Sequence, residues 1–194
     1  MLNTKPNRLV VFDCDGTLVD SQHHIVDCMA AAFGEHGLAP PAAEAVRAVV
    51  GLSLAEAIGR LVPVGVAADL LRLTESYKRA FFALRQRPGT LEPLYDGVAA
   101  TIEHLVDAGF LLGVATGKSR RGLDAVLAGH GLAHHFVTLQ TVDSAPGKPD
   151  PTMLRQAIAE AGAAPETAVM IGDTTFDMEM AVRAGVPAIG VGWG

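Results

Sequence analysis

The stretch VVFDCDGTLVDS, residues Val10–Ser21, decides how the rest of the chain is interpreted. It begins as an apolar run with the character of a buried strand, and this run stops at Asp13, with Asp15 and Gly16 close behind. Two carboxylates one residue apart repel each other, and the burial of either without a partner is costly. Either a cation is present at this point, or the carboxylates have a chemical role there.

The composition is that of a globular protein. The chain has 194 residues, of which 49% are hydrophobic and 19% are charged. This length suits one medium domain, or a core domain with a small insertion. The net charge of −6 argues against nucleic acid and against an anionic membrane surface, because both favour basic patches. We therefore expect neither nucleic acid nor a membrane as a partner.

Cysteine usage and the N-terminus indicate the cytoplasm as the expected location. Cys14 and Cys28 form no CxxC pair, and we expect both to be free thiols in a reducing compartment. The first residues, MLNTKPNRLVVFD, contain no long apolar segment of a signal peptide. No apolar run reaches about 18 residues without a charge, so no membrane span is expected.

Short apolar runs alternate with helical patterns in the second half of the chain. Strands are expected at 9–13, 110–116, 135–140, 168–173 and 187–192. Helices are expected at 98–109, after Ser119, at 150–162 with Asp150 as N-cap, and between Asp173 and Gly185. This alternation predicts an α/β fold with a Rossmann-like three-layer core, in which helices cover both faces of a parallel sheet.

The stretch from about residue 21 to residue 87 has helical patterns and no strand signals. Ser21 can cap its first helix, and Ser53 with Glu56 fits a capping box. A crossover between two strands needs far fewer residues than this. We therefore predict an inserted α-helical cap subdomain at residues 20–89, and an α/β catalytic core made of residues 1–19 and 90–194.

Polar residues follow the strands at the points where the strands end. They are Asp13 and Asp15, then Thr116-Gly117-Lys118, then GKPDP at 147–151, and finally Asp173 and Asp177. Ligands of an open α/β sheet bind outside the carboxyl ends of its strands. We therefore expect these four groups to converge on a single crevice.

The residue types in this crevice indicate what it binds. Every candidate metal ligand is an oxygen donor, and such a set favours a hard cation, with Mg²⁺ the usual choice beside a phosphate. Lys148, the Thr116 hydroxyl and backbone N–H groups suit a phosphoryl group. Acids for a metal beside a lysine for phosphate predict phosphoryl transfer.

The segments DCDGTLVDS, ATGKS, GKPDP and GDTTFDM resemble, in order and spacing, the four motifs of the haloacid dehalogenase-like hydrolase superfamily. The resemblance covers essentially the whole chain and is greatest to the phosphoglycolate-phosphatase-like branch, whose small α-helical cap the insertion resembles. Relatives commonly continue with another helix and strand, whereas this sequence stops at GVGWG. The four motifs are expected to be complete nevertheless.

The resemblance implies a role for each motif residue. Asp13 would be the nucleophile that forms an aspartyl-phosphate, and Asp15 would act first as general acid and then as general base. Mg²⁺ would be held by Asp13, the backbone carbonyl of Asp15, Asp173 and Asp177, the last as ligand or as support. Thr116, Gly117 and Lys148 would hold the phosphoryl oxygens, and Gly16 would allow a tight turn and a close backbone approach.

Other residues have weaker signals or a second interpretation. Asp177 could instead be a first-turn acid that the helix dipole favours. We expect Lys118, Arg120 and Arg121 on a helix surface, Cys14 in the layer opposite its two acids, and His134 and His135 pointing apart on a strand. Candidate substrate contacts in the cap are His23, Arg47, Ser53 and Lys78, with His24 also placed near the crevice. Tyr77, Phe81 and Phe82 are expected inside the cap.

Together these observations predict a cytoplasmic, Mg²⁺-dependent phosphatase of small phosphorylated metabolites, such as phosphoglycolate-like esters or sugar phosphates. A phosphomutase on the same scaffold is an alternative, and a haloacid dehalogenase is another, although Asp15 and the acidic metal site favour phosphate chemistry. A protein that binds a phosphorylated ligand without catalysis is the remaining alternative, and it would not need a competent Asp13.

Overall fold

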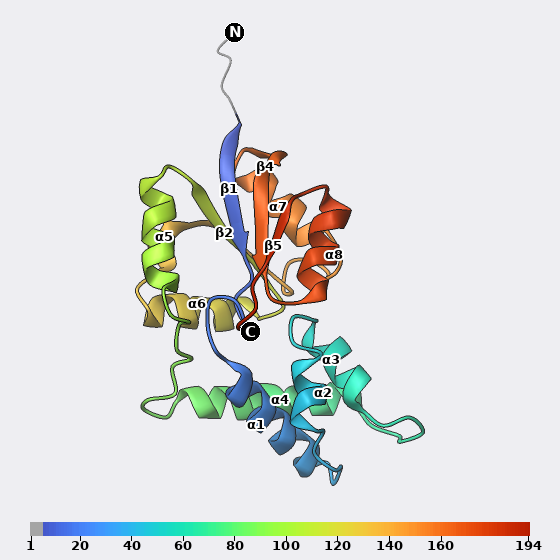
Figure 1. The fold of residues 1–194 in the computed structure, drawn as a ribbon. Helices are drawn as coiled ribbons and strands as arrows, with labels where there is room; N and C mark the ends of the chain where they lie inside the picture. Colours follow the sequence, from blue (N-terminus) through green and yellow to red (C-terminus); the bar gives the residue numbers. More distant parts are fainter. Residues whose placement is uncertain (1–5) are drawn as a thin grey trace.

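The structure is a computed structural model that describes residues 6–194. Its centre is a five-stranded parallel sheet in the order β3-β2-β1-β4-β5 (Figure 1). The strands are β1 (Asn7–Phe12), β2 (Leu111–Thr116), β3 (Phe136–Thr141), β4 (Ala163–Gly172) and β5 (Ala188–Gly190). All five predicted strands are therefore present, and the predicted α/β fold with a parallel Rossmann-like sheet is confirmed.

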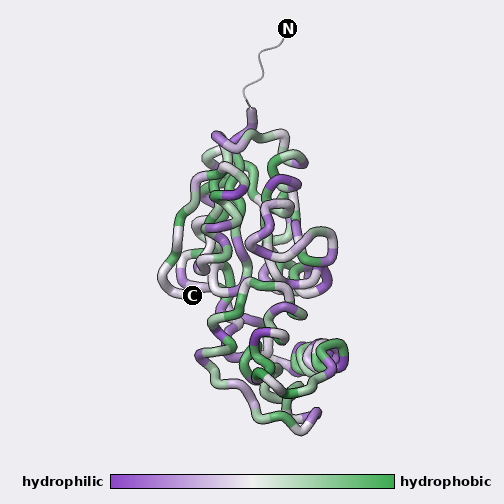
Figure 2. The backbone as a smooth tube through the Cα atoms, turned by 90° about the vertical axis from the view of Figure 1, so that its right-hand side faces the viewer, coloured by the Kyte–Doolittle hydropathy of each residue, from purple (hydrophilic) through white to green (hydrophobic). Residues whose placement is uncertain are grey.

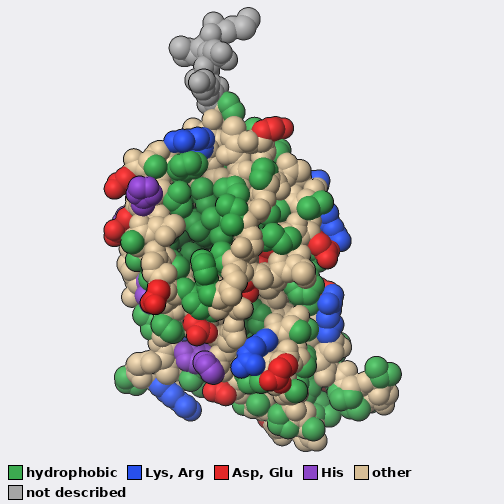
Figure 3. All heavy atoms as spheres, in the orientation of Figure 1, with side chains coloured by type: hydrophobic (Ala, Val, Ile, Leu, Met, Phe, Trp, Pro, Cys, Tyr) green, Lys and Arg blue, Asp and Glu red, His purple; other side chains and the backbone are tan. Residues whose placement is uncertain are grey.

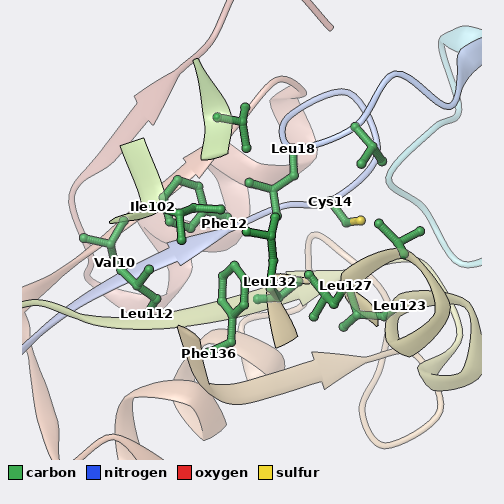
Figure 4. Close-up of a cluster of buried hydrophobic side chains, with 14 residues drawn as sticks. Val10, Phe12, Cys14, Leu18, Ile102, Leu112, Leu123, Leu127, Leu132 and Phe136 are labelled. Atoms are coloured by element: carbon green, nitrogen blue, oxygen red, sulfur yellow. The ribbon is translucent and has the colours of Figure 1, made fainter. Parts of the chain in front are cut away.

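Helices pack against both faces of this sheet. Successive residues of β1 point into opposite layers, so they contact different helices. Val10 and Phe12 pack with α5 (Val98–Asp107) and α6 (Arg120–Gly129) in one hydrophobic cluster (Figure 4). Leu9 and Val11 pack with α7 (Thr152–Glu160) and α8 (Thr175–Ala184) in the other. Cys14 lies in the first cluster, as its position in the strand pattern predicts, and both cysteines are free thiols.

The insertion between β1 and α5 is helical in all its regular elements. It consists of α1 (Gln22–Glu35), α2 (Ala43–Arg47), α3 (Leu54–Leu61) and α4 (Leu70–Arg85). These helices share a separate cluster that includes Met29, Phe33, Ile58 and Leu73. In both ribbon and tube views they lie at the end of the sheet toward which β1 runs (Figures 1 and 2). The separate packing supports the proposed division into a core and a cap at 20–89.

The two chain segments that join the insertion to the sheet run side by side. Asp20 N donates to Pro93 O at 2.8 Å, and Tyr95 N donates to Leu18 O at 3.1 Å. Val19 and Leu94 form an isolated antiparallel bridge between these bonds. Both segments leave the sheet next to Asp15, so any movement of the cap relative to the core would shift backbone beside this residue.

Some local expectations are wrong. His134 and His135 do not point apart on a strand, because they lie in a short 3₁₀ helix (Ala133–His135) before β3, with ring centroids 3.9 Å apart. Ser21 makes no side-chain cap bond at α1. Asp150 is not the N-cap of α7, which is Pro151, although its Oδ1 accepts a bond from Thr152 N.

The part of the surface seen in Figure 3 carries a broad apolar region. Apolar side chains gather on the face of the sheet that Figure 3 turns toward the viewer, and all of β5 is exposed. Within residues 6–194, each helix is too short or too polar to cross a lipid bilayer. The N-terminal segment on which the signal-peptide expectation rests includes residues 1–5, which lie outside the described residues.

Candidate active site

Three carboxylates from separate elements meet at the carboxyl edge of the sheet. Asp13 follows β1, Asp173 follows β4, and Asp177 lies in the first turn of α8. Asp13 N donates to Ile171 O at 2.8 Å, which aligns the two strand ends. Each of the three residues offers one carboxylate oxygen, and these oxygens lie within 4.8 Å of one another. Sequence positions 160 residues apart are thus brought together by the pairing of β1 with β4.

Lys148 lies inside this acidic cluster and is fully buried. Its Nζ is 2.6 Å from Asp13 Oδ1 and 2.6 Å from Asp177 Oδ1. Burial alone would lower the pKa of this lysine, but the two carboxylates outweigh burial and raise it. Lys148 is therefore a fixed ammonium that holds two acids in place.

Asp177 is both a first-turn acid of α8 and a member of the acidic cluster, so it combines the two interpretations that the sequence leaves open. Its Oδ2 accepts from Thr174 N at 3.1 Å and from Thr174 Oγ1 at 2.7 Å, and Thr174 Oγ1 accepts from Asp177 N, so the pair forms a capping box at α8. Its Oδ1 faces Lys148. Both oxygens are thus engaged, and Asp177 fits the part of a support better than that of a direct ligand.

One lysine does not balance the charge of three buried or half-buried acids. Burial raises the pKa of Asp13 to about 8, with Lys148 acting against this rise and Asp177 and Asp173 adding to it. Burial and Asp177 also raise the pKa of Asp173. Asp13 Oδ2 is buried and has no hydrogen-bond partner among the described residues. An oxygen-only donor set with a buried orphan oxygen fits a hard divalent cation such as Mg²⁺.

Asp15 belongs to a second charged cluster, and here the expectation for Lys118 is wrong. Lys118 is not on the helix surface: its Nζ lies 2.7 Å from Asp15 Oδ1 and 3.5 Å from Glu92 Oε1. Glu92 Oε1 in turn accepts a 2.8 Å bond from Arg85. β1 and β2 are neighbours in the sheet, so the residues just beyond their ends meet.

The second cluster is balanced, with two acids and two bases. Burial would raise the pKa of Asp15, but Lys118 reverses this effect and lowers it overall. Burial would also raise the pKa of Glu92. Lys118 and Arg85 outweigh burial, so the pKa of Glu92 is lowered overall. The sequence patterns did not predict Glu92 or Arg85 as site residues. A lone acid in a connecting segment and an arginine near a helix end carry no motif that indicates burial together.

Glycines allow the close approach of backbone at several points of the site. Gly16 has φ +87°, and a Cβ there would collide with the Asp173 carboxylate, as the expected close approach requires. A Cβ at Gly117 would lie 2.6 Å from Leu52 O and 2.8 Å from Gly51 O. A Cβ at Gly147 would lie 3.1 Å from Ser53 N. The cap segment 51–53 therefore rests on both loops that carry the buried lysines.

A cavity of about 830 Å³ opens between the cap and the core. Its core wall includes Asp13, Asp15, Thr116 and Gly117, whereas Lys148, Asp173 and Asp177 do not line it. The Thr116 hydroxyl is buried and accepts a bond from Lys118 N at 3.2 Å. Asp13 is thus the residue through which the acidic cluster reaches the cavity.

The cap residues divide into those that line this cavity and those that do not. Ser53 and Lys78 line it. His23 is exposed outside it, and Arg47 pairs with Glu44 on α2. His24 also lies outside the lining, with its ring edge-on to Phe81.

Tyr77, Phe81 and Phe82 are not confined to the cap interior, because all three line the cavity. Arg121 lies beside them, 5.0 Å from the Phe82 ring, whereas Arg120 is an exposed partner of Asp124, as expected for a helix surface.

Comparison with known proteins agrees with this geometry. Residues 10–191 match the family described as haloacid dehalogenase-like hydrolase. The chain is 36% identical over 190 residues to probable phosphatase IndB of Dickeya dadantii, with 96% of this chain and 81% of IndB covered. It is 32% identical to a phosphoglycolate phosphatase of Rhodospirillum rubrum, with 96% and 80% covered.

Another relative carries a different activity in its name. The chain is 31% identical to tyrosine-protein kinase PtkA of Mycobacterium tuberculosis, with 96% of this chain covered, and it spans 62% of PtkA. The relatives of this chain therefore include proteins named as phosphatases and a protein named as a kinase.

Solved structures show the same fold. A haloacid dehalogenase-like hydrolase from Bacteroides fragilis has a TM-score of 0.84 at 27% identity, with 97% of this chain and 89% of that chain covered. A mutant of CbbY from Rhodobacter sphaeroides, in complex with xylulose-1,5-bisphosphate, has a TM-score of 0.81 at 25% identity, with 95% and 85% covered. From its sequence, its fold and the acids at the ends of its strands, the chain belongs to the haloacid dehalogenase-like hydrolases.

Proposed function

We propose that this protein is a Mg²⁺-dependent phosphatase that hydrolyses small phosphate monoesters through an aspartyl-phosphate on Asp13. That it is a phosphatase of its family rests on the family match and on relatives named as phosphatases. The metal, the mechanism and the substrate are the proposal. The observation that carries it is the contrast between Asp13, in an acid-rich cluster, and Asp15, in a balanced one.

Asp13 is suited to be the nucleophile. Lys148 holds one of its oxygens, and the other has no partner among the described residues, so one oxygen is positioned and one is available for attack on phosphorus. Bound Mg²⁺ would neutralise the charge between this carboxylate and the incoming phosphate. Asp13, Asp173 and the backbone carbonyl of Asp15 would hold the metal, and Asp177 would support the cluster through Lys148.

Asp15 is suited to general acid and base chemistry. Its ion pair with Lys118 keeps it charged before substrate arrives. A phosphoryl group held by Thr116, Gly117 and Lys148 would also attract the ammonium of Lys118, and its negative charge beside Asp15 would raise the pKa of Asp15. Asp15 could then give a proton to the leaving oxygen, and it could later take one from the attacking water.

The likeness to CbbY, solved with xylulose-1,5-bisphosphate, supports a small phosphorylated substrate. Phosphomutase action remains the second candidate, because both reactions share the step at Asp13. Water labelled with heavy oxygen separates them, since a phosphatase places the label in released phosphate. The cytoplasm remains the proposed location.

The decisive experiment compares Asp13→Asn with wild type on phenyl phosphate in the presence of Mg²⁺. Loss of the nucleophile should lower kcat by at least about a thousandfold. Asp107→Asn, the same change at an exposed acid on α5, is the matched control and should keep full activity. Equal activity in Asp13→Asn would overturn the mechanism, and an inactive wild type over a wide ester panel would favour a binding protein.

A further inference from the structure

The cap wall of the cavity is mainly apolar and aromatic. Ile25 and Met29 of α1, Val49 and Leu52 after α2, and three rings of α4 form this wall, which is continuous with Asp13 and Asp15. The three rings are those of Tyr77, Phe81 and Phe82. With about 830 Å³, the cavity is much larger than a two-carbon acid requires.

The Phe81 ring lies beside Lys118, which is the ion-pair partner of the residue that would protonate the leaving oxygen. Lys118, which pairs with Asp15 at 2.7 Å, has its Nζ 5.4 Å from the centroid of Phe81. Arg85 lies 4.8 Å from the same centroid, and Tyr77 stands 5.7 Å away, tilted by 36°. These contacts fix the ring in position. A leaving group that departs from phosphorus and takes its proton from Asp15 is therefore close to an aromatic surface.

Three of the four lysines and arginines that line the cavity already have acidic partners. Lys78 pairs with Glu75 at 2.8 Å, Arg85 with Glu92 at 2.8 Å, and Lys118 with Asp15. Among the described residues that line the cavity, Arg121 alone of the lysines and arginines has no acidic partner, and its guanidinium lies over Phe82. A substrate with a carboxylate or a second phosphate would find little free positive charge on the cap wall. Such a substrate would also leave the apolar wall in contact with water.

We propose that the substrate is a phosphate monoester whose leaving group is large, uncharged and planar, an aromatic or heteroaromatic group bound against Phe81 and Phe82. This inference rests on the proposed phosphatase function and narrows its substrate class. It separates the protein from enzymes that favour phosphoglycolate, because phosphoglycolate is small and carries a carboxylate. The rings supply stacking surface, and the cap segment 51–53 closes the cavity over the ester.

Esters of primary alcohols test the proposal, because the acidity of their leaving groups varies little. The panel contains ethyl, cyclohexylmethyl, benzyl and naphthylmethyl phosphate, with phosphoglycolate and ribose 5-phosphate as polar esters. We expect kcat/KM to rise at least about tenfold from ethyl to benzyl phosphate, and to rise again for naphthylmethyl phosphate. Benzyl phosphate should exceed cyclohexylmethyl phosphate about threefold, because only the planar ring can stack.

The variants Phe82→Leu and Phe110→Leu show whether the rings of α4 cause this preference. Phe82 is 49% exposed, so its replacement should not unfold the cap, and it should lower the benzyl-to-ethyl ratio of kcat/KM about fivefold. Phe110 precedes β2 and does not line the cavity, so the same change there should leave the ratio as in wild type.

The outcomes separate this inference from the function on which it rests. A panel in which phosphoglycolate or ribose 5-phosphate is the best substrate, or in which benzyl and cyclohexylmethyl phosphate react equally, overturns the aromatic assignment while phosphatase action stands. A panel in which no ester is hydrolysed, ethyl phosphate included, overturns the proposed function itself.

Discussion

Two Gly-Lys pairs at the edge of the sheet look alike in the sequence and differ in the structure. In each, the glycine supports the cap segment 51–53 and the lysine is buried against acids. Lys148 is fully buried in a cluster where Asp13, Asp173 and Asp177 outnumber it. The Lys118 side chain is 8% exposed, and Arg85 helps it to balance Asp15 and Glu92.

The difference in charge balance indicates a difference in role. The cluster around Lys148 has an excess of negative charge, and a divalent cation would remove this excess. The cluster around Lys118 is complete without a cation, so it can keep Asp15 charged until an anionic substrate arrives. The different surroundings of Asp13 and Asp15 thus suit them to different roles. Asp13 is suited to metal binding and attack on phosphorus, and Asp15 is suited to proton transfer.

Lys148→Met should produce the largest effect. It leaves Asp13 and Asp177 buried without their shared cation, which should lower the free energy of unfolding by about 3–5 kcal/mol in metal-free protein. Activity should be lost as well, because the nucleophile is no longer positioned. Urea unfolding at neutral pH measures the stability change.

A second change shows whether charge or packing causes this loss. Adding Asp13→Asn to Lys148→Met removes one of the two unpaired carboxylates and should recover part of the lost stability. A double variant as unstable as Lys148→Met would mean that the methionine simply packs badly.

Mg²⁺ should stabilise wild type by a somewhat smaller amount than the loss in Lys148→Met. At one hundred times its dissociation constant, a ligand that binds only the folded state adds about 2.7 kcal/mol to the unfolding free energy. Asp173→Asn should lose this gain, whereas Lys118→Met should keep it, because Lys118 belongs to the other cluster. Thermal unfolding with Mg²⁺ or with EDTA tests this, and equal stabilisation of both variants would contradict the division between the clusters.

The acid-rich cluster was largely predictable from the sequence, and the balanced one was not. Asp13, Asp173 and Lys148 follow apolar strands or lie in recognisable motifs, and parallel strands bring their ends to one edge. Lys118 follows a strand in the same way, yet its place just before a helix resembles a surface position. Its partner Glu92 comes from a connecting segment without periodicity, and its burial depends on the cap position.

The aromatic stripe of α4 shows a second limit of sequence patterns. Tyr77 and Phe81 are spaced for an apolar helix face, and this spacing is the same whether the face covers a core or a cavity. Ring packing against Lys118 and Arg85 is a tertiary fact that no local pattern carries. The fold was therefore more predictable than the cap side of the site.

Lys118→Met should cost less stability than Lys148→Met, about 2 kcal/mol at neutral pH, because Arg85 still pairs with Glu92. The loss should depend on pH. The folded-state pKa of Asp15 lies below its ordinary value of 3.8, so the pair stabilises the protein above that pH and ceases to do so as pH falls through the lowered pKa. Wild type and variant should therefore converge in strongly acidic solution, which urea unfolding across pH measures. A difference that stays constant with pH would exclude the ion pair as its cause.

The smallest effects should come from the two glycines. Gly117→Ala places a Cβ 2.6 Å from Leu52 O, which is backbone and cannot turn aside, so cap segment 51–53 must move away from the core. Gly147→Ala meets Ser53 at 3.1 Å and needs a shift of only tenths of an ångström. We expect kcat/KM to fall about fivefold in Gly117→Ala and less than about twofold in Gly147→Ala, with thermal stability nearly unchanged because the cap can relax outward. Equal kinetic losses in the two variants would mean that the cap does not rest on the Lys118 loop during turnover, and the link between cap closure and the Asp15–Lys118 pair would then be lost.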